Sequence, residues 1–227
     1  MSGRVQVAID GPAGAGKSSV ARGLARALGY TYIDTGAMYR AVAYRASQAG
    51  FNVQRDAGPI GDLAGALAFE FRDVNGEQHL FVDGEDVSEI IRTPEVGNLS
   101  SPVSAIPAVR EHLVAAQRRM AGQGGTVMEG RDIGTVVLPG AQVKVFLTAT
   151  DQERARRREH QLVEMGIAQP FDQILADIRE RDHRDSTRAV APLKKADDAI
   201  EIVSDNMTKD QVIAELVRIV RTAEEAI

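Results

Sequence analysis

One run of eight residues has the types and spacing to hold a polyphosphate, because it matches the pattern G-x-x-x-x-G-K-[ST]: Gly11, Pro12, Ala13, Gly14, Ala15, Gly16, Lys17 and Ser18. The glycines let successive backbone N–H groups turn toward an anion, where a Cβ would block them. Lys17 can reach the outer phosphates, and the Ser18 hydroxyl can ligate Mg²⁺. The run therefore predicts a site for a nucleoside triphosphate.

The sequence on both sides of this loop predicts the strand and the helix that position it. Residues 5–9 form a short, mostly β-branched stretch, which indicates a strand. After the loop, apolar residues recur at helical spacing and Gly29 is placed to end the helix. These apolar residues are Val20, Leu24, Ala27 and Leu28. A helix that starts near Lys17 adds its positive N-terminal dipole to the anion site.

The rest of the chain predicts an α/β fold, in which a parallel sheet is flanked by helices on both faces. Further strands are expected at 30–33, 126–128, 143–147 and 199–203, and helices after residue 35 and at 107–121, 151–166, 171–182 and 209–226. We expect Asp151 to cap the helix that it begins. Asp10, Asp34 and Glu129 fall at strand ends, where ligands of such sheets collect.

One segment, residues 69–87, has a different character. Its apolar residues alternate around Asn75-Gly76, a strong hairpin signal, and residues 83–86 give a second turn. The segment predicts a small antiparallel insert in the parallel fold.

Arginines gather in two stretches, residues 154–158 and 179–188. Arg154, Arg157 and Arg158 fall on one side of a helix, between glycine and proline breaks that leave it room to move as a lid. Such a run is ordinarily a solvated helix face. Arginine, however, binds phosphate oxygens bidentately and keeps its charge.

This arginine content favours a phosphate acceptor over a hydroxyl acceptor. A phosphate is already an anionic nucleophile, so its transfer reaction needs positioning and charge neutralisation rather than a general base. A kinase acting on a hydroxyl would instead need a carboxylate near the acceptor, a role that Asp34 could fill.

Composition bounds the function further. The 227 residues suit one sizeable α/β unit, and a formal net charge of −5 argues against a nucleic-acid partner. The chain has no cysteine, which excludes disulfides and thiol chemistry. Because a strand is predicted to begin almost at once after Arg4, we expect no signal peptide, and no apolar run reaches membrane-spanning length. We expect a cytoplasmic protein without a membrane partner, and a monomer.

Seven motifs in this order resemble those of the bacterial cytidylate kinases, a branch of the nucleoside monophosphate kinases. They lie at 9–18, 34–40, 84–88, 91–93, 129–135, 181–186 and 188–193. The resemblance covers nearly the whole chain, and the last two motifs are far more specific than the phosphate-binding loop. It implies transfer of the γ-phosphate of ATP to CMP or dCMP, with Mg²⁺. It also implies one kinase unit with a P-loop core (1–62, 96–150 and 186–227), a monophosphate-binding insert (63–95) and a helical lid (151–185).

The resemblance implies a role for each of several residues. It assigns the base of CMP to Ser101, Arg110 and Asp132, the ribose to Arg181 and Asp185, and the acceptor phosphate to Thr35, Arg40, Arg131 and Arg188. It assigns ATP to the loop residues 11–18 with Ser19, and to Arg154, Arg157 and Arg158 of the lid. Lys17, Arg131, Arg157 and Arg188 take the catalytic roles, and Ser18 ligates the metal.

The base-reading role has a chemical reason. The Asp132 carboxylate can accept from the exocyclic amine of cytosine, whereas uracil presents a carbonyl there and would leave both groups unpaired. Such a mismatch discriminates more strongly than a missing methylene.

Alternatives stay open at this point. The same fold could act on UMP, AMP or a small alcohol, and a P-loop switch or regulatory ATP-binding protein is a rival of another class. Guanine-binding switches usually carry N-K-x-D, which residues 206–209 (Asn-Met-Thr-Lys) do not match.

Glu129 stands where related sequences often carry Asp, and Thr35 where many carry Ser, with the functional group kept in both. Either Asp34 or Glu129 could orient the water shell of Mg²⁺.

Overall fold

The structure, a computed structural model, describes residues 3–122 and 124–227, and the chain divides into two compact units. The first unit combines the stretch up to Tyr32 with the stretch from Gly124 onward, and the second is Ile33–Gly122. The predicted division into core, insert and lid stays a prediction.

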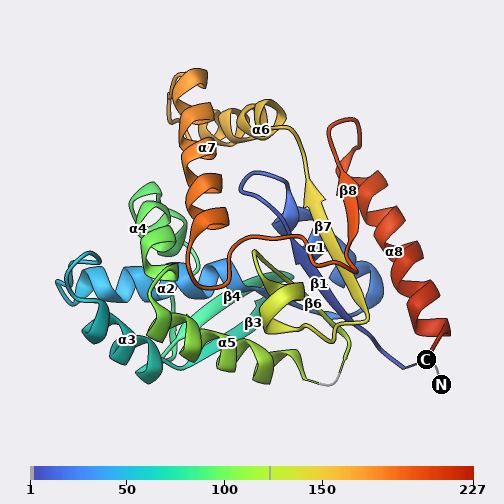
Figure 1. Ribbon diagram of the computed structural model, residues 1–227, viewed down its shortest axis with the longest axis horizontal. Coiled ribbons are helices and arrows are strands. Elements are labelled where there is room, and N and C mark those ends of the chain that lie inside the picture. Colours follow the sequence, from blue (N-terminus) through green and yellow to red (C-terminus); the bar gives the residue numbers. More distant parts are fainter. Residues whose placement is uncertain (1–2, 123) are drawn as a thin grey trace. The chain divides into compact units, whose positions relative to one another are not determined.

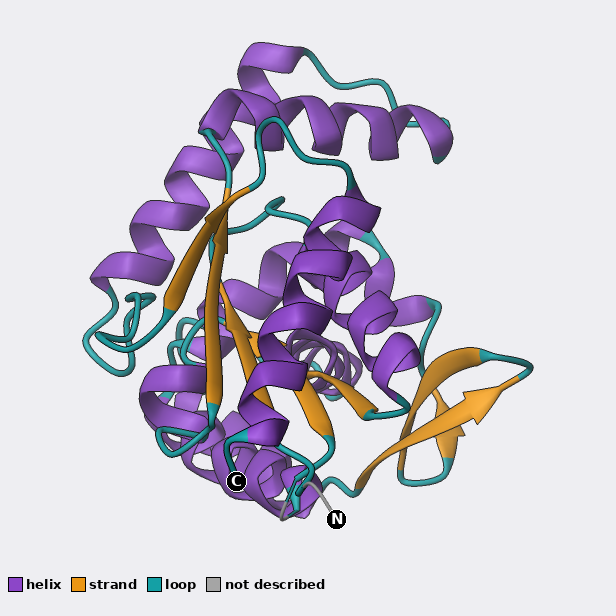
Figure 2. Ribbon diagram, turned by 90° about the vertical axis from the view of Figure 1, so that its right-hand side faces the viewer, coloured by secondary structure: helices purple, strands orange, loops and turns teal. Residues whose placement is uncertain are grey.

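A five-stranded sheet has the order β2-β6-β1-β7-β8 (Figures 1 and 2). Its strands are β1 (Gln6–Asp10), β2 (Thr31–Asp34), β6 (Thr126–Gly130), β7 (Val143–Thr148) and β8 (Ile200–Val203). β1 pairs in parallel with β6 and β7, and β7 pairs in parallel with β8, so these four strands end at the same edge. The predicted parallel α/β sheet is therefore confirmed.

The helices of the first unit are α1 (Lys17–Leu28), α6 (Asp151–Glu164), α7 (Phe171–Thr187) and α8 (Lys209–Glu225), with a π-helical turn η2 (Ile133–Val137). Side chains of α1 and α8, Leu24 and Leu216 among them, pack with Val7, Ile9 and Val145 of the sheet. Gly29 ends α1 with a φ of 65°, as predicted. This packing fixes the start of α1 against the end of β1, where the phosphate-binding pattern lies.

Two details of α6 and α7 differ from the prediction. Thr150, not Asp151, is the N-cap of α6, because its Oγ accepts from the backbone N–H of Glu153 at 3.3 Å. Asp151 is the first helical residue and forms an ion pair with Arg179 at 2.6 Å. α7 ends at Thr187 instead of 182, so the arginine- and aspartate-rich stretch is helical. Ala155 and Leu162 of α6 pack with Ile174 and Ile178 of α7, which joins the two helices.

The second unit contains α2 (Thr35–Gln48), α3 (Ala57–Ala66), the short helix η1 (Ile90–Arg92), α4 (Pro94–Ser104) and α5 (Pro107–Ala121). Its strands β3 (Phe69–Val74), β4 (Glu77–Val82) and β5 (Glu85–Asp86) form an antiparallel sheet. The turn Asn75-Gly76, with φ angles of 56° and 83°, joins β3 to β4 and confirms the predicted hairpin. Within residues 3–122 and 124–227, no helix combines the length and the apolarity needed to cross a bilayer.

Candidate functional site

The phosphate-binding pattern forms the loop between β1 and α1. Gly11, Gly14 and Gly16 have φ angles of 151°, 76° and 85°, which residues with a side chain rarely adopt. A Cβ at Gly11 would lie 2.0 Å from the Leu147 carbonyl oxygen, so only glycine fits there. The loop is thus built as the sequence predicted, and its backbone passes too close to β7 for any larger residue.

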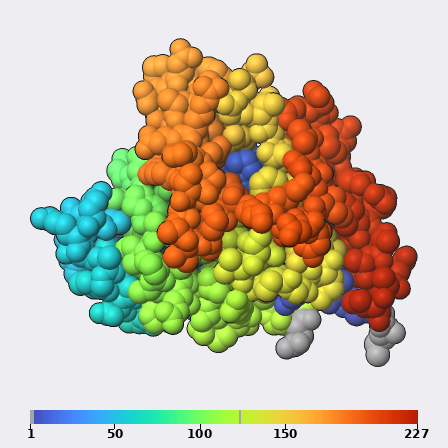
Figure 3. Space-filling model, viewed as in Figure 1, coloured from blue at the N-terminus to red at the C-terminus, as the bar shows by residue number. Residues whose placement is uncertain are grey.

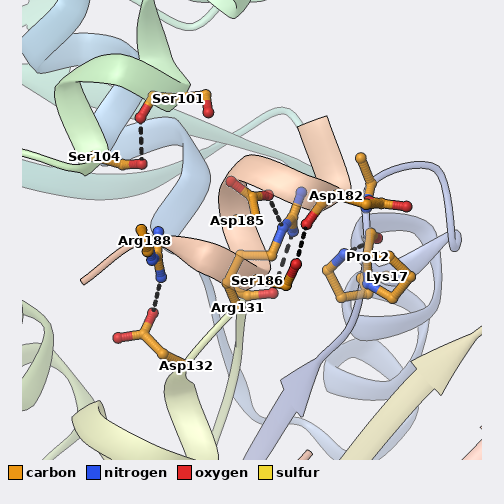
Figure 4. Close-up of polar contacts among 12 residues, drawn as sticks. Pro12, Lys17, Ser101, Ser104, Arg131, Asp132, Asp182, Asp185, Ser186 and Arg188 are labelled. Carbon is orange, nitrogen blue, oxygen red and sulfur yellow. Dashed lines mark hydrogen bonds and ion pairs between the residues drawn. The ribbon is translucent and has the colours of Figure 1, made fainter. Parts of the chain in front are cut away.

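Lys17 is the buried cation of this loop. Its side chain is largely enclosed, and Nζ donates to the Pro12 carbonyl at 2.7 Å (Figure 4). Burial, followed by the positive charge of Arg131, holds the pKa of Lys17 well below its ordinary value. An incoming polyphosphate would supply the negative charge that the buried ammonium needs. Ser18 and Ser19, next along α1, are both exposed.

Two of the three arginines predicted for ATP contact carbonyls of the loop. Arg154 is 6% exposed, and its guanidinium donates to the Ala13 carbonyl and to the Ala149 carbonyl, both at 3.0 Å. Arg157 donates to the Ala15 carbonyl at 3.4 Å, and also to the Ser204 hydroxyl at 3.0 Å. These contacts join α6 directly to the loop.

Arg158, the third of these arginines, is half-buried. It forms no hydrogen bond or ion pair with any residue in the described part of the chain.

In the space-filling view, blue atoms of the N-terminal stretch remain visible between the yellow and orange segments of α6 and α7 (Figure 3). This face of the first unit is therefore not fully covered beside the two helices.

A second group of charges in the first unit joins the end of β6 to α7 and the residue that follows it. Arg131 Nε pairs with Asp185 at 2.9 Å, and Arg188 Nη2 pairs with Asp132 at 3.4 Å (Figure 4). Both carboxylates are buried, with 5% of Asp185 and 4% of Asp132 exposed. Burial raises the pKa of Asp185, but the charges of Arg131, Arg181 and Arg188 outweigh it and hold the pKa below its ordinary value. The structure thus brings together five of the predicted substrate-binding side chains.

Asp10, at the end of β1, holds the backbone that follows Asp132. Its two carboxylate oxygens accept from the N–H groups of Ile133 and Gly134 at 2.8 and 2.7 Å. Burial raises the pKa of Asp10 to about 6, although these two hydrogen bonds lower it. The sequence places Asp10 at a strand end but gives no sign of these partners, which lie more than 120 residues away.

Glu129 is buried at the end of β6 and accepts a hydrogen bond from the Tyr32 hydroxyl. Its carboxylate therefore has a protein partner, which the sequence reasoning missed because the two residues belong to different strands. Asp182 of α7 was missed as well. It pairs with Arg154 of α6 at 2.5 Å. The spacing of acidic residues along α7 does not predict this ion pair with another helix.

The second unit holds the remaining predicted residues. Asp34 caps α2 by accepting from the Ala37 N–H at 2.9 Å, and it pairs with Arg40 at 3.0 Å. Thr35 is the buried first residue of the same helix. The predicted phosphate ligands Thr35 and Arg40 therefore lie in the first two turns of α2, with Arg40 aligned by the capping carboxylate.

Ser101 and Arg110 meet at Ser104, at the end of α4. The Ser101 carbonyl accepts from the Ser104 hydroxyl at 2.7 Å (Figure 4), and Arg110 donates to the Ser104 carbonyl at 3.4 Å. The Arg110 guanidinium also lies 5.7 Å from the centre of the Tyr39 ring, at cation–π distance. Two of the three predicted base-reading residues are thus held in one place by α2, α4 and α5.

Comparison with known proteins identifies the family of this chain. The family model described as cytidylate kinase matches residues 7–222. The chain is 51% identical to the cytidylate kinase of Mycobacterium leprae over 224 residues, which is 98% of each chain. It is 48% identical to the cytidylate kinase of Anoxybacillus flavithermus over 225 residues, which covers 99% of this chain and 100% of that protein.

Among solved structures, an uncharacterized protein from Eubacterium ventriosum aligns with a TM-score of 0.53 over 97% of this chain and 99% of that one. At 12% sequence identity, this likeness concerns the fold alone. The match of the family model and the two relatives extend over nearly the whole chain. The chain belongs to the cytidylate kinase family.

Proposed function

We propose that this chain transfers the γ-phosphate of ATP to CMP or dCMP, giving ADP and CDP or dCDP. The observation that carries the proposal is the pair of buried ion pairs, Arg131 with Asp185 and Arg188 with Asp132, in a chain of this family. Such pairs hold guanidinium and carboxylate groups in fixed positions, largely shielded from water. A nucleoside monophosphate carries a phosphate that suits the guanidinium groups, and hydroxyl and amine donors that suit the carboxylates.

On the donor side, the phosphate-binding loop and Lys17 are proposed to bind the phosphates of ATP, with Ser18 and Ser19 at the start of α1. Arg157 and Arg158 of α6 would neutralise charge that develops on the transferred group. Arg154 belongs to the same proposed set, and in the structure its guanidinium is directed to the loop backbone. Catalysis on this side consists of positioning and electrostatics.

On the acceptor side, the phosphate of CMP is proposed to bind Arg131 and Arg188, together with Thr35 and Arg40. The phosphate would take over the guanidinium groups that now pair with Asp185 and Asp132. These carboxylates would then accept from the substrate.

The released carboxylates have complementary partners on the nucleotide. Asp185, with Arg181, would accept from a ribose hydroxyl, and Asp132, with Ser101 and Arg110, would accept from the cytosine amine. The acceptor phosphate is an anionic nucleophile, so no general base is required. Lys17, Arg131, Arg157 and Arg188 are the groups proposed to contact the reacting phosphates.

Mg²⁺ fits the donor loop. The metal keeps several water ligands and uses one or two protein oxygens beside phosphate oxygens, and the exposed Ser18 follows the buried Lys17 directly. When bound, the ion would neutralise charge on the transferred phosphate. Ser18 is the residue proposed to hold it. We further propose that the enzyme works in the cytoplasm as a monomer, without a membrane or nucleic-acid partner.

The test is an ADP-release assay with Mg²⁺–ATP and each of CMP, dCMP, UMP, AMP and GMP. Turnover confined largely to CMP and dCMP is the expected result. Lys17→Met should lose most of the turnover with every acceptor, because it removes a charge at the transferred phosphates. Preference for another monophosphate would remove the base-reading assignment of Asp132, and turnover of none would contradict the proposed activity.

A further inference from the structure

We propose that Asp182 is a positioning residue for the phosphate-binding loop, acting through Arg154 on the peptide groups of Ala13. The inference rests on the proposed function, because it explains how the donor loop is kept ready for ATP. It concerns three contacts inside the first unit, none of which the sequence motifs assign.

The three contacts enclose one residue of the loop. Asp182 Oδ1 accepts from the Ala13 N–H at 3.4 Å, and Asp182 Oδ2 pairs with Arg154 Nη1 at 2.5 Å. The same Nη1 donates to the Ala13 carbonyl at 3.0 Å. Both polar backbone groups of Ala13 are therefore satisfied by one carboxylate–guanidinium pair, from α7 and α6.

Arg154 is anchored from the other side as well. Its Nε donates to the Ala149 carbonyl at 3.0 Å, just beyond the end of β7. A Cβ at Gly14 would lie 3.1 Å from Arg154 Cβ, so the helix lies directly against the loop. The guanidinium is thus fixed between the sheet and the loop, with little room to turn.

The Asp182–Arg154 pair, here called the clamp, affects anion binding because it sets the direction of a loop carbonyl. A carbonyl oxygen that turned toward a bound phosphate would repel it, whereas N–H groups attract it. Arg154 holds the Ala13 carbonyl, and Arg157 holds the Ala15 carbonyl. Asp182 matters because it is the carboxylate paired with a guanidinium that is 6% exposed, and an arginine buried without a counter-charge is strongly disfavoured.

The decisive variant is Asp182→Asn, which keeps an acceptor for the Ala13 N–H but removes the charge that compensates Arg154. We expect the dissociation constants of inorganic tripolyphosphate and of ATP, measured by calorimetry without CMP, to rise about tenfold, the scale of one charged hydrogen bond. The KM for CMP should change less than twofold. Asp182→Glu should restore part of the affinity.

Asp177→Asn is the matched control, because the exposed Asp177 lies on the same helix and accepts only from the side chains of Gln169 and Gln173 in the described structure. It should bind tripolyphosphate like the wild type. A circular dichroism spectrum and a melting curve verify that each variant is folded. A folded Asp182→Asn variant with the affinity of Asp177→Asn would overturn the inference. A rise in its affinity would also overturn it, since the carboxylate would then compete with the anion.

Arg154→Gln provides an independent check. If Asp182 acts through Arg154, the double variant should bind tripolyphosphate about as weakly as Arg154→Gln alone. Fully additive losses would contradict a single clamp. Because binding is measured without turnover, this test is independent of the proposed acceptor. If the enzyme is inactive on CMP but Asp182→Asn still weakens tripolyphosphate binding, the role of Asp182 is supported and the proposed function is contradicted.

Discussion

Replacing Asp10 by asparagine should remove a pH dependence of stability that comes from one buried carboxylate. Burial raises the pKa of Asp10 from 3.8 to about 6, against the two backbone hydrogen bonds from Ile133 and Gly134. Because the folded pKa exceeds the unfolded one, the contribution to stability is fully present below pH 3.8 and is lost as the pH rises through 6. The amide of the Asp10→Asn variant does not titrate, so the variant lacks this loss.

The size of the effect follows from the two pKa values. A shift of about two units corresponds to about 3 kcal/mol at 1.36 kcal/mol per unit, reached only when both states are fully ionised. Between pH 5 and pH 7 the folded group passes through its own pKa, so the change is smaller, about 1.3 kcal/mol. The charges that face the carboxylate are Asp132, which raises the pKa, and Lys17, which lowers it.

Urea unfolding of the wild type and Asp10→Asn at pH 5, 6 and 7 measures the difference in the free energy of unfolding. The wild type should lose about 1.3 kcal/mol relative to the variant over this range. Titration of the Asp10 carboxyl carbon by NMR gives the pKa directly. A value near 4, or a difference in unfolding free energy that stays constant with pH, would refute the reasoning that burial dominates at this position.

Three further outcomes are expected. Asp132→Ala should lower the ratio of kcat/KM for CMP to that for UMP by about tenfold or more while the KM for ATP stays within about twofold, and an unchanged ratio would exclude base reading. Gly11→Ala should abolish ATP binding measured by calorimetry, because its Cβ would lie 2.0 Å from the Leu147 carbonyl; retained affinity would contradict the close approach. Leu113→Ala, at a side chain with 0% exposure, should cost about 2–5 kcal/mol in urea unfolding, whereas Val163→Ala, at 68% exposure, should cost almost nothing.

The sequence predicted the parallel sheet and the phosphate-binding loop because both depend on local patterns. The β-branched run before Asp10 and the helical spacing after Lys17 identify β1 and α1. α3 and α4 were not predicted, since α3 contains three glycines and a proline, and α4 contains Pro102. Packing of Ile60 and Val103 into the core of the second unit stabilises these helices despite their low propensity.

The site was predictable in its residue types but not in its pairings. The resemblance to the family supplied Arg131, Asp132, Asp185 and Arg188 as candidates, and the structure shows that they form ion pairs with one another. Contacts such as Asp182 with Arg154 join side chains 28 residues apart and have no periodic signal. Side-chain partners depend on how elements pack, which a single sequence does not encode in any local pattern.

The pairing of β1 with β6 has a consequence for synthesis on the ribosome. Gln6 pairs with Thr126, so the central strand β1 cannot pair with β6 until 120 further residues have been synthesised. At about 5–20 residues per second, that delay is roughly 6–24 seconds. During this time the apolar side chains of Val7 and Ile9 have neither neighbouring strand, while the second unit, continuous in sequence, can form its own contacts. In the emerging chain, the apolar strand β1 therefore stays without its neighbouring strands until β6 and β7 have been made.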